Sequence, residues 1–197
     1  MPLFRLVFVY PTSEIFMRHL ILSLLIAGAA TAAESGTLTI FDDTWQNGWF
    51  EAGQTGDPLQ KDVVHEGKAA IEVMMDAQNS IFNCFNTKVI PVENYGAVSF
   101  WAHGSDDGGQ NLKVYLRQLD GEKDVATVIQ TLKPLVKEEW QLITIPLDEF
   151  KAKGGNGLNS VMFQGDQDGS FWLLDDLALV PVVLPPAAAS PTAPATP

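Results

Sequence analysis

The folded part of the chain ends in an apolar run that carries two adjacent carboxylates. Residues 171–180 read Phe-Trp-Leu-Leu-Asp-Asp-Leu-Ala-Leu-Val, and the acidic pair is Asp175 and Asp176. An unpaired charge in a protein core costs several kcal/mol, so a buried strand with this sequence requires a partner for its carboxylates. A second acidic pair, Asp42 and Asp43, lies at the start of the same domain, also on a strand-like run. If the first and last strands lie side by side, these four carboxylates converge.

Four converging carboxylates have two interpretations. They are suitable ligands for Ca²⁺, which prefers six to eight oxygen atoms from carboxylates and backbone carbonyls. Alternatively, one carboxylate of each pair faces solvent while the other caps a turn. In the first interpretation a turn between the acidic pairs adds backbone oxygens, and the expected set is Asp42, Asp43, Asp175, Asp176, His65 and Lys68. The residues alone leave both interpretations open.

The rest of the domain has the pattern of an all-β protein. Helical periodicity is nearly absent, and short runs rich in Val, Ile, Phe and Thr alternate with Gly, Asn, Asp and Pro. Eleven predicted strands within this one domain favour a single-domain, two-sheet jelly-roll β-sandwich. One helical turn is expected at 147–151. The predicted strands are 37–41, 48–52, 58–64, 68–74, 80–86, 96–102, 111–118, 124–131, 140–146, 160–164 and 171–180.

The two ends of the chain differ in composition from this domain. Met17-Arg18-His19 is a short basic start, Leu20–Ala29 is apolar, and Ala30-Thr31-Ala32 has the small residues of a signal-peptidase site. We therefore expect residues 1–33 to be a signal peptide, with a true start near Met17 and cleavage near Ala32 or Ala33. The predicted domain covers residues 34–184. Residues 185–197 contain only Pro, Ala, Ser and Thr and predict a solvated, semi-extended tail.

Charge and cysteine content exclude several classes of partner. The formal net charge is −12, and it becomes −13 without residues 1–33 because Arg5, Arg18 and Glu14 are lost. Such a field repels nucleic acids and anionic membranes. No later segment is long and apolar enough for membrane insertion. Cys84 is the single cysteine, so no intrachain disulfide can form. The expected signal peptide predicts a secreted or periplasmic protein. The sequence does not indicate its oligomeric state.

One predicted strand presents polar and aromatic side chains to solvent. In residues 111–118, Leu112, Val114 and Leu116 fall on one face. The other face carries Lys113, Tyr115 and Arg117. Gln118 breaks the pattern on the apolar side and is expected to end the strand.

This polar face has the chemistry of a carbohydrate contact. Aromatic rings stack on sugar rings, while amides and guanidinium groups bond sugar hydroxyls. Gln164, Asn83 and Gln130 can project from neighbouring strands of the same sheet. The alternative is a solvated face with an aromatic–cation contact, worth ~0.5–1 kcal/mol.

Catalytic motifs are not found. Neither His65 nor His103 belongs to an H-E-x-x-H metal motif, and no G-x-S-x-G elbow occurs. Glycoside hydrolysis needs two suitably spaced carboxylates, which an acidic chain always offers somewhere. We assign no catalytic residue. Of the tryptophans, Trp101, Trp140 and Trp172 are expected to pack in the core or at edges, whereas Trp45 and Trp49 are placed at a rim.

Several segments, in order, resemble jelly-roll carbohydrate-binding modules with a galactose-binding-like β-sandwich. The resemblance covers Leu38–Val180. It implies a structural Ca²⁺ near the paired termini, with Asp42, Asp175 in preference to Asp176, and carbonyls of the turn 65–68 as ligands. It also implies that sugar binds the concave sheet. The segments that carry it are 41–49, 65–73, 95–104, 108–114, 140–147 and 171–177.

Three functional hypotheses result. The first is a secreted, non-catalytic protein that binds a polysaccharide or oligosaccharide and contains a structural calcium site. The second is a structural or interaction protein of the cell envelope with the same sandwich and no sugar binding. The third is a small jelly-roll glycan hydrolase or lyase. For the first, the expected sugar-binding residues are Tyr115, Arg117, Lys113, Gln164 and Asn83.

Overall fold

The computed structural model describes residues 36–53, 57, 59–75, 80–120, 123–152, 157–165 and 169–181, without the side chains of residues 120, 123 and 124. The predicted signal peptide and the Pro/Ala-rich tail lie outside these residues. Among the described residues, no helix has the length and apolar character needed to cross a membrane.

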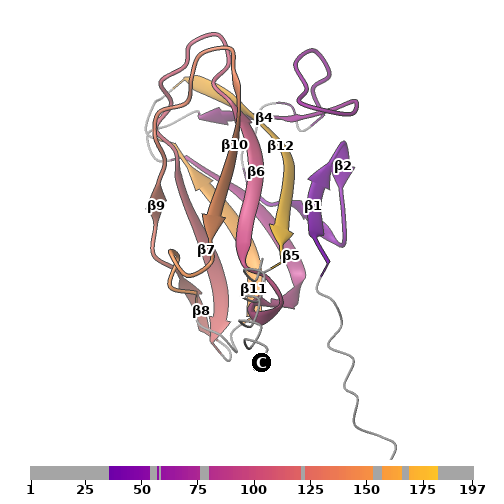
Figure 1. Cartoon of the computed structure of the whole chain (residues 1–197), viewed down its shortest axis with the longest axis vertical. Helices are drawn as coiled ribbons and strands as arrows, with labels where there is room; N and C mark the ends of the chain where they lie inside the picture. Colours follow the sequence, from indigo (N-terminus) through magenta and orange to yellow (C-terminus); the bar gives the residue numbers. More distant parts are fainter. Residues whose placement is uncertain are drawn as a thin grey trace, which may run out of the picture. The chain divides into compact units, whose positions relative to one another are not determined.

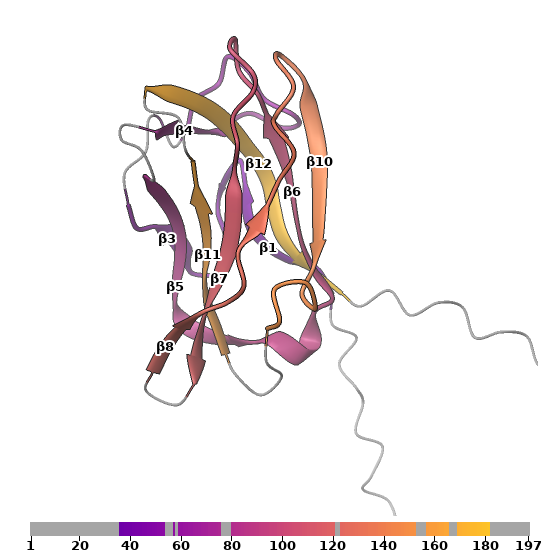
Figure 2. The same ribbon diagram turned by 90° about the vertical axis from the view of Figure 1, so that its left-hand side faces the viewer.

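Two antiparallel sheets of six strands each form the domain, as Figures 1 and 2 show. The first sheet has the order β10-β6-β12-β1-β2, with β4 also paired to β12. The second has the order β3-β5-β11-β7-β8, with β9 also paired to β7. One short 3-10 helix, Val92–Asn94, follows β5. The strands are β1 Leu38–Asp42, β2 Thr44–Trp45, β3 Trp49–Glu51, β4 Ile71–Met75, β5 Ile81–Pro91, β6 Ala97–His103, β7 Lys113–Asp120, β8 Lys123–Ala126, β9 Gln130–Thr131, β10 Trp140–Pro146, β11 Gly157–Gln164 and β12 Ser170–Val180. The all-β sandwich expected from the sequence is confirmed.

Two predicted segments differ from the observed structure. Of the predicted strand 58–64, the described residues 59–64 form a loop with an isolated bridge between Gln60 and Ala70. The Gln60 side chain explains this, because its Oε1 accepts the N–H groups of Asp62 and Val63, so the backbone is satisfied locally instead of by a neighbouring strand. The predicted helical turn at 147–151 is a run of hydrogen-bonded turns.

The strands near β7 also differ from the prediction. Strand β7 continues to Asp120, so Gln118 does not end it but is buried inside the sandwich with 4% of its surface exposed. The predicted strand 124–131 is divided into β8 and β9.

The hydrophobic core lies between the two sheets. Its centre is a group of aromatic rings in which the Phe163 ring lies 5.1 Å from Phe100 and 5.4 Å from Trp172. Cys84 is fully buried there, and burial raises the pKa of its thiol. Trp49 is 2% exposed and belongs to this core, so the prediction that it lines a rim is wrong. Trp49 and Phe50 are neighbours in a strand of three residues, and so short a strand does not indicate from the sequence which of the two faces inward.

The first and last strands are neighbours, which is the condition under which the two acidic pairs can converge. Strand β1 pairs with β12 through Leu38 opposite Leu179 and Phe41 opposite Leu177. The pairing of β12 with β6 shifts between Asp175 and Ala178, and Asp176 has a left-handed φ of 49°. This irregularity separates the two carboxylates: Asp175 is fully buried, whereas the side chain of Asp176 is 30% exposed.

Candidate functional site

The outer face of the second sheet collects the five residues that the sequence suggested for sugar contact. Residues paired across antiparallel strands share a face. Because Phe82, Cys84, Val114, Val161 and Phe163 point into the core, their neighbours in each strand point outward. The register gives three rows across β5, β11 and β7: Ile81–Gln164–Lys113, Asn83–Met162–Tyr115 and Phe85–Ser160–Arg117.

Strand β3 extends this face at one edge. Phe50 lies opposite Phe85, and their rings meet edge to face with centroids 5.4 Å apart. Phe50 is 41% exposed. We call the ten residues together the outer face: Phe50, Ile81, Asn83, Phe85, Lys113, Tyr115, Arg117, Ser160, Met162 and Gln164.

Sequence reasoning missed some of these residues and misplaced another. Phe85 could have been found from the alternation in β5, where Phe82 and Cys84 face inward. Gln130 lies opposite Val114 and therefore on the other face, where its side-chain amide donates to the Glu149 carbonyl oxygen.

The side chains in the middle of this face are nearly buried. Tyr115 is 9% exposed, Met162 7% and Ser160 1%, although all three occupy outward positions of their strands. Side chains that point away from the core and still lose their solvent contact must be enclosed by neighbours on the same face. Tyr115, Met162 and Ser160 are therefore largely covered by the side chains around them on this face.

Two polar groups on this face are held in water-poor surroundings. The Asn83 side-chain oxygen is buried and accepts no hydrogen bond from any described residue. Leaving such an acceptor unpaired costs ~1–3 kcal/mol, so a hydroxyl donor from a ligand would be favourable there. Burial raises the pKa of Tyr115, and the nearby Arg117 cation opposes this shift.

A second group of polar residues lies where β1 and β12 meet the turn 65–69. Asp175 Oδ2 accepts the N–H of His65 at 3.1 Å, and its Oδ1 accepts the N–H of Asp176 at 2.9 Å. Burial raises the pKa of the Asp175 carboxyl to about 6, against the opposing effect of these N–H groups. The buried carboxylate is thus bonded to backbone groups.

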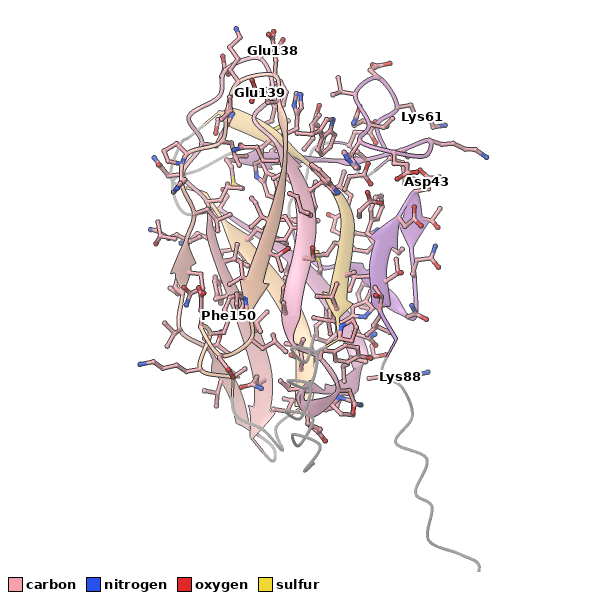
Figure 3. All side chains as sticks on the ribbon, in the orientation of Figure 1. Asp43, Lys61, Lys88, Glu138, Glu139 and Phe150 are labelled. Atoms are coloured by element: carbon pink, nitrogen blue, oxygen red, sulfur yellow. The ribbon has the colours of Figure 1, made fainter. Side chains whose placement is uncertain are left out.

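Asp43 holds the other end of the same turn. Its Oδ1 accepts the N–H groups of Lys68 and Ala69, which hold the pKa of this carboxyl below its ordinary value. Figure 3 labels Asp43 at the end of β1, next to the loop that carries Lys61. The turn therefore directs N–H groups, and not carbonyl oxygens, at both Asp43 and Asp175.

These contacts restrict which residues can hold a cation. The ligand atoms of His65, Glu66 and Asp176 lie within 4.8 Å of one another. His65 Nδ1 is 2.9 Å from Asp176 Oδ2, and its ring stacks on Trp101 at 3.8 Å. Among the expected ligands, Lys68 contributes an N–H group to Asp43, and Asp42 is exposed on β1. The resemblance favours Asp175 as a ligand, whereas the geometry favours Asp176.

The sequence matches the model of a protein family over most of its length. The model of the family described as carbohydrate binding domain 30 matches residues 37–179. No curated protein gave a sequence match.

Solved structures share the sandwich architecture. The family 30 carbohydrate-binding module of a Clostridium thermocellum cellulosomal cellulase has a TM-score of 0.57 at 16% identity, with 75% of this chain and 99% of that chain covered. A xylan-binding domain from Paenibacillus barcinonensis has a TM-score of 0.56 at 13% identity, with 76% and 96% covered. A family 11 module from Clostridium thermocellum, solved with a β-1,3-1,4-mixed-linked tetrasaccharide, has a TM-score of 0.52 at 12% identity, with 74% and 96% covered. At these identities the likeness concerns the fold.

Proposed function

Because the chain belongs to the carbohydrate binding domain 30 family, we propose that it is a secreted, non-catalytic protein that binds a polysaccharide or oligosaccharide on the outer face. The observation that carries this proposal is the placement of Tyr115 in the middle of this face, with hydrogen-bonding side chains in the same and adjacent rows. Among the described side chains of this face there is no carboxylate. The two acidic groups that glycoside hydrolysis uses would have to come from elsewhere.

The arrangement suits a chain of sugars that crosses the strands. Tyr115 in β7 and Phe85 in β5 are separated by β11. Since neighbouring strands lie ~4.8 Å apart, the two aromatic positions are about 10 Å apart across the sheet, and Phe50 extends the apolar surface by one more strand. Asn83 offers an acceptor in the row of Tyr115, Ser160 a hydroxyl group in the row of Phe85, and Gln164 an amide in the row of Lys113.

The test is affinity electrophoresis through gels that contain β-glucan, xylan or mannan. We expect Phe50→Ala and Tyr115→Ala each to weaken binding at least tenfold, which corresponds to about 1.4 kcal/mol. Phe50→Ala is included because Phe50 is exposed and its loss should leave the fold intact. Leu142→Ala is the matched control, since Leu142 is 56% exposed on β10 of the other sheet. Undiminished binding by both variants would place the site elsewhere, and a folded protein that no gel retards would favour an interaction role in the cell envelope.

We also propose a structural calcium ion near the paired termini, held by Asp176 and Glu66 with His65 beside them. Support comes from the spacing of these three groups and from the oxygen preference of Ca²⁺. An ion that binds only the folded state raises its melting temperature. We expect Ca²⁺ to raise the melting temperature of the wild type above its value in EDTA. The effect should disappear in Asp176→Asn and persist in Asp42→Asn. A melting temperature that does not respond to Ca²⁺ in the wild type would contradict this assignment.

A further inference from the structure

Two cations flank Tyr115 on the outer face. Lys113 and Arg117 lie two residues before and after Tyr115 on β7, so all three side chains leave the sheet on the same side. Arg117 is the only arginine after residue 18. Both cationic side chains are half-buried. A chain with twice as many acidic as basic residues, 24 against 12, thus places two of its few cations beside the proposed sugar-stacking ring.

The overall negative charge does not cancel this local arrangement. Alternate residues of a strand are about 6.7 Å apart, so both cations lie within roughly one Debye length, ~8 Å at physiological ionic strength, of Tyr115. Charges on more distant surfaces are largely screened over their greater separations. Lys113 forms no ion pair with any residue that the structure describes. In β8 the backbone register places Asp124 opposite Leu119.

Burial makes the charge of these two residues relevant to the ligand. A ligand that covers this face removes water from the groups beneath it, and a cation that loses water without gaining an anion is destabilised. A neutral sugar offers hydroxyl oxygens as partial compensation. A carboxylate offers full charge, and it can accept two parallel hydrogen bonds from a guanidinium group or one charge-assisted bond from an ammonium group.

We propose, on the basis of the proposed function, that the preferred ligand is a polysaccharide that carries uronic acid carboxylates. A sugar ring stacks on Tyr115, and the carboxylates of that ring or of its neighbours pair with Arg117 and Lys113. The ligand class is therefore an acidic glycan, which the outer face distinguishes from its neutral counterpart by charge.

The experiment compares acidic polymers with chemically matched neutral ones. The full-length protein is titrated with glucuronoxylan, alginate and polygalacturonate, and with the carboxyl-reduced form of each. We expect at least one acidic polymer to bind tenfold or more tightly than its reduced form at about 50 mM NaCl, with the difference largely lost at about 500 mM. The double variant Lys113→Gln/Arg117→Gln should remove the preference. The charge-matched control Lys88→Gln/Lys137→Gln, at two exposed lysines that are not part of the outer face, should retain it.

The outcomes separate this inference from the proposed function. Equal affinity for acidic and reduced polymers, or binding only to neutral β-glucan, xylan or mannan, overturns the charge preference and leaves carbohydrate binding in place. A preference that survives the Lys113/Arg117 double variant also overturns the inference, because the charge would then be recognised elsewhere. A folded protein that binds none of the acidic or neutral polymers overturns both.

Discussion

Asp175 shows how a fully buried carboxylate is accommodated in an apolar strand. The adjacent peptide groups of His65 and Asp176 donate to its two oxygens, which is the role that a metal ion would otherwise have. Backbone N–H groups carry only partial positive charge, so they offset the loss of water incompletely. The pKa of the carboxyl, raised to about 6, reflects this balance.

The raised pKa of Asp175 predicts a pH dependence of stability. Between its unfolded value of 3.8 and its folded value of about 6, the folded state binds a proton that the unfolded state has released. Stability from this group therefore falls as the pH rises from about 4 to 6 and is constant above that. At 1.36 kcal/mol per pKa unit, the change is at most about 3 kcal/mol.

We expect the free energy of unfolding of the wild type, relative to that of Asp175→Asn, to be larger at pH ~4 than at pH ~7. Denaturant titrations of both proteins in EDTA measure this difference, and the subtraction removes contributions from other carboxyls. A difference that does not vary with pH would mean that Asp175 is ionised throughout the range.

Single residues of the outer face were predictable where a period of two applied. The alternation in β7 placed Lys113, Tyr115 and Arg117 on one face without knowledge of the fold. It did not indicate that Tyr115 is nearly buried, because that depends on side chains from other strands. Phe50 was missed, since a strand of three residues contains too few positions to define a face.

At the scale of elements, the turn 65–69 joins the first and last strands. Asp43 at the end of β1 binds one half of the turn, and Asp175 in β12 binds the other. Gly67 lies between these contacts with a φ of +75°, and a Cβ atom at this position would overlap the Asp43 carboxylate. The glycine is thus required both by the backbone conformation and by the carboxylate next to it.

We expect Gly67→Ala to destabilise the protein more than Gly169→Ala does. Gly169 has the same φ of +75° and nothing within 4 Å of an added Cβ, so it reports the backbone strain alone, about 1 kcal/mol. The additional cost at Gly67 should be of the order of 1–2 kcal/mol and should vanish when Asp43 is also replaced by Ala. Thermal unfolding of the four single and double variants tests this. Equal costs for the two glycines would show that the turn moves freely away from Asp43.

Strands were easier to predict from the sequence than the segments between them. The observed β10, Trp140–Pro146, has the predicted bounds, because an alternating apolar run is bounded by polar residues and a proline. The segment 58–64 ends in two valines, which favour a strand, yet the Gln60 side chain accepts the N–H groups of Asp62 and Val63. Local side-chain hydrogen bonds of this kind depend on a conformation that composition does not specify.

At the scale of the whole molecule, the order of strands in the two sheets was not predictable from the sequence. Each strand pattern specifies a buried face but not a neighbour, and only the paired acidic residues of β1 and β12 gave a long-range signal. The convergence of the five suggested sugar-binding residues depends on the adjacency of β5, β11 and β7, which are far apart in the chain. Their placement on one face is a property of the topology.

Strand β12 has a consequence for when this protein can fold. It is the last strand in the described part of the chain, yet it occupies the interior of the first sheet and pairs with β1, β4 and β6. Contacts between distant parts of a chain form slowly, since loop closure precedes the gain in pairing energy. The first sheet cannot assemble during synthesis until residues 170–180 have left the ribosome. A growing chain therefore remains without its completed sandwich until synthesis of the domain is nearly finished.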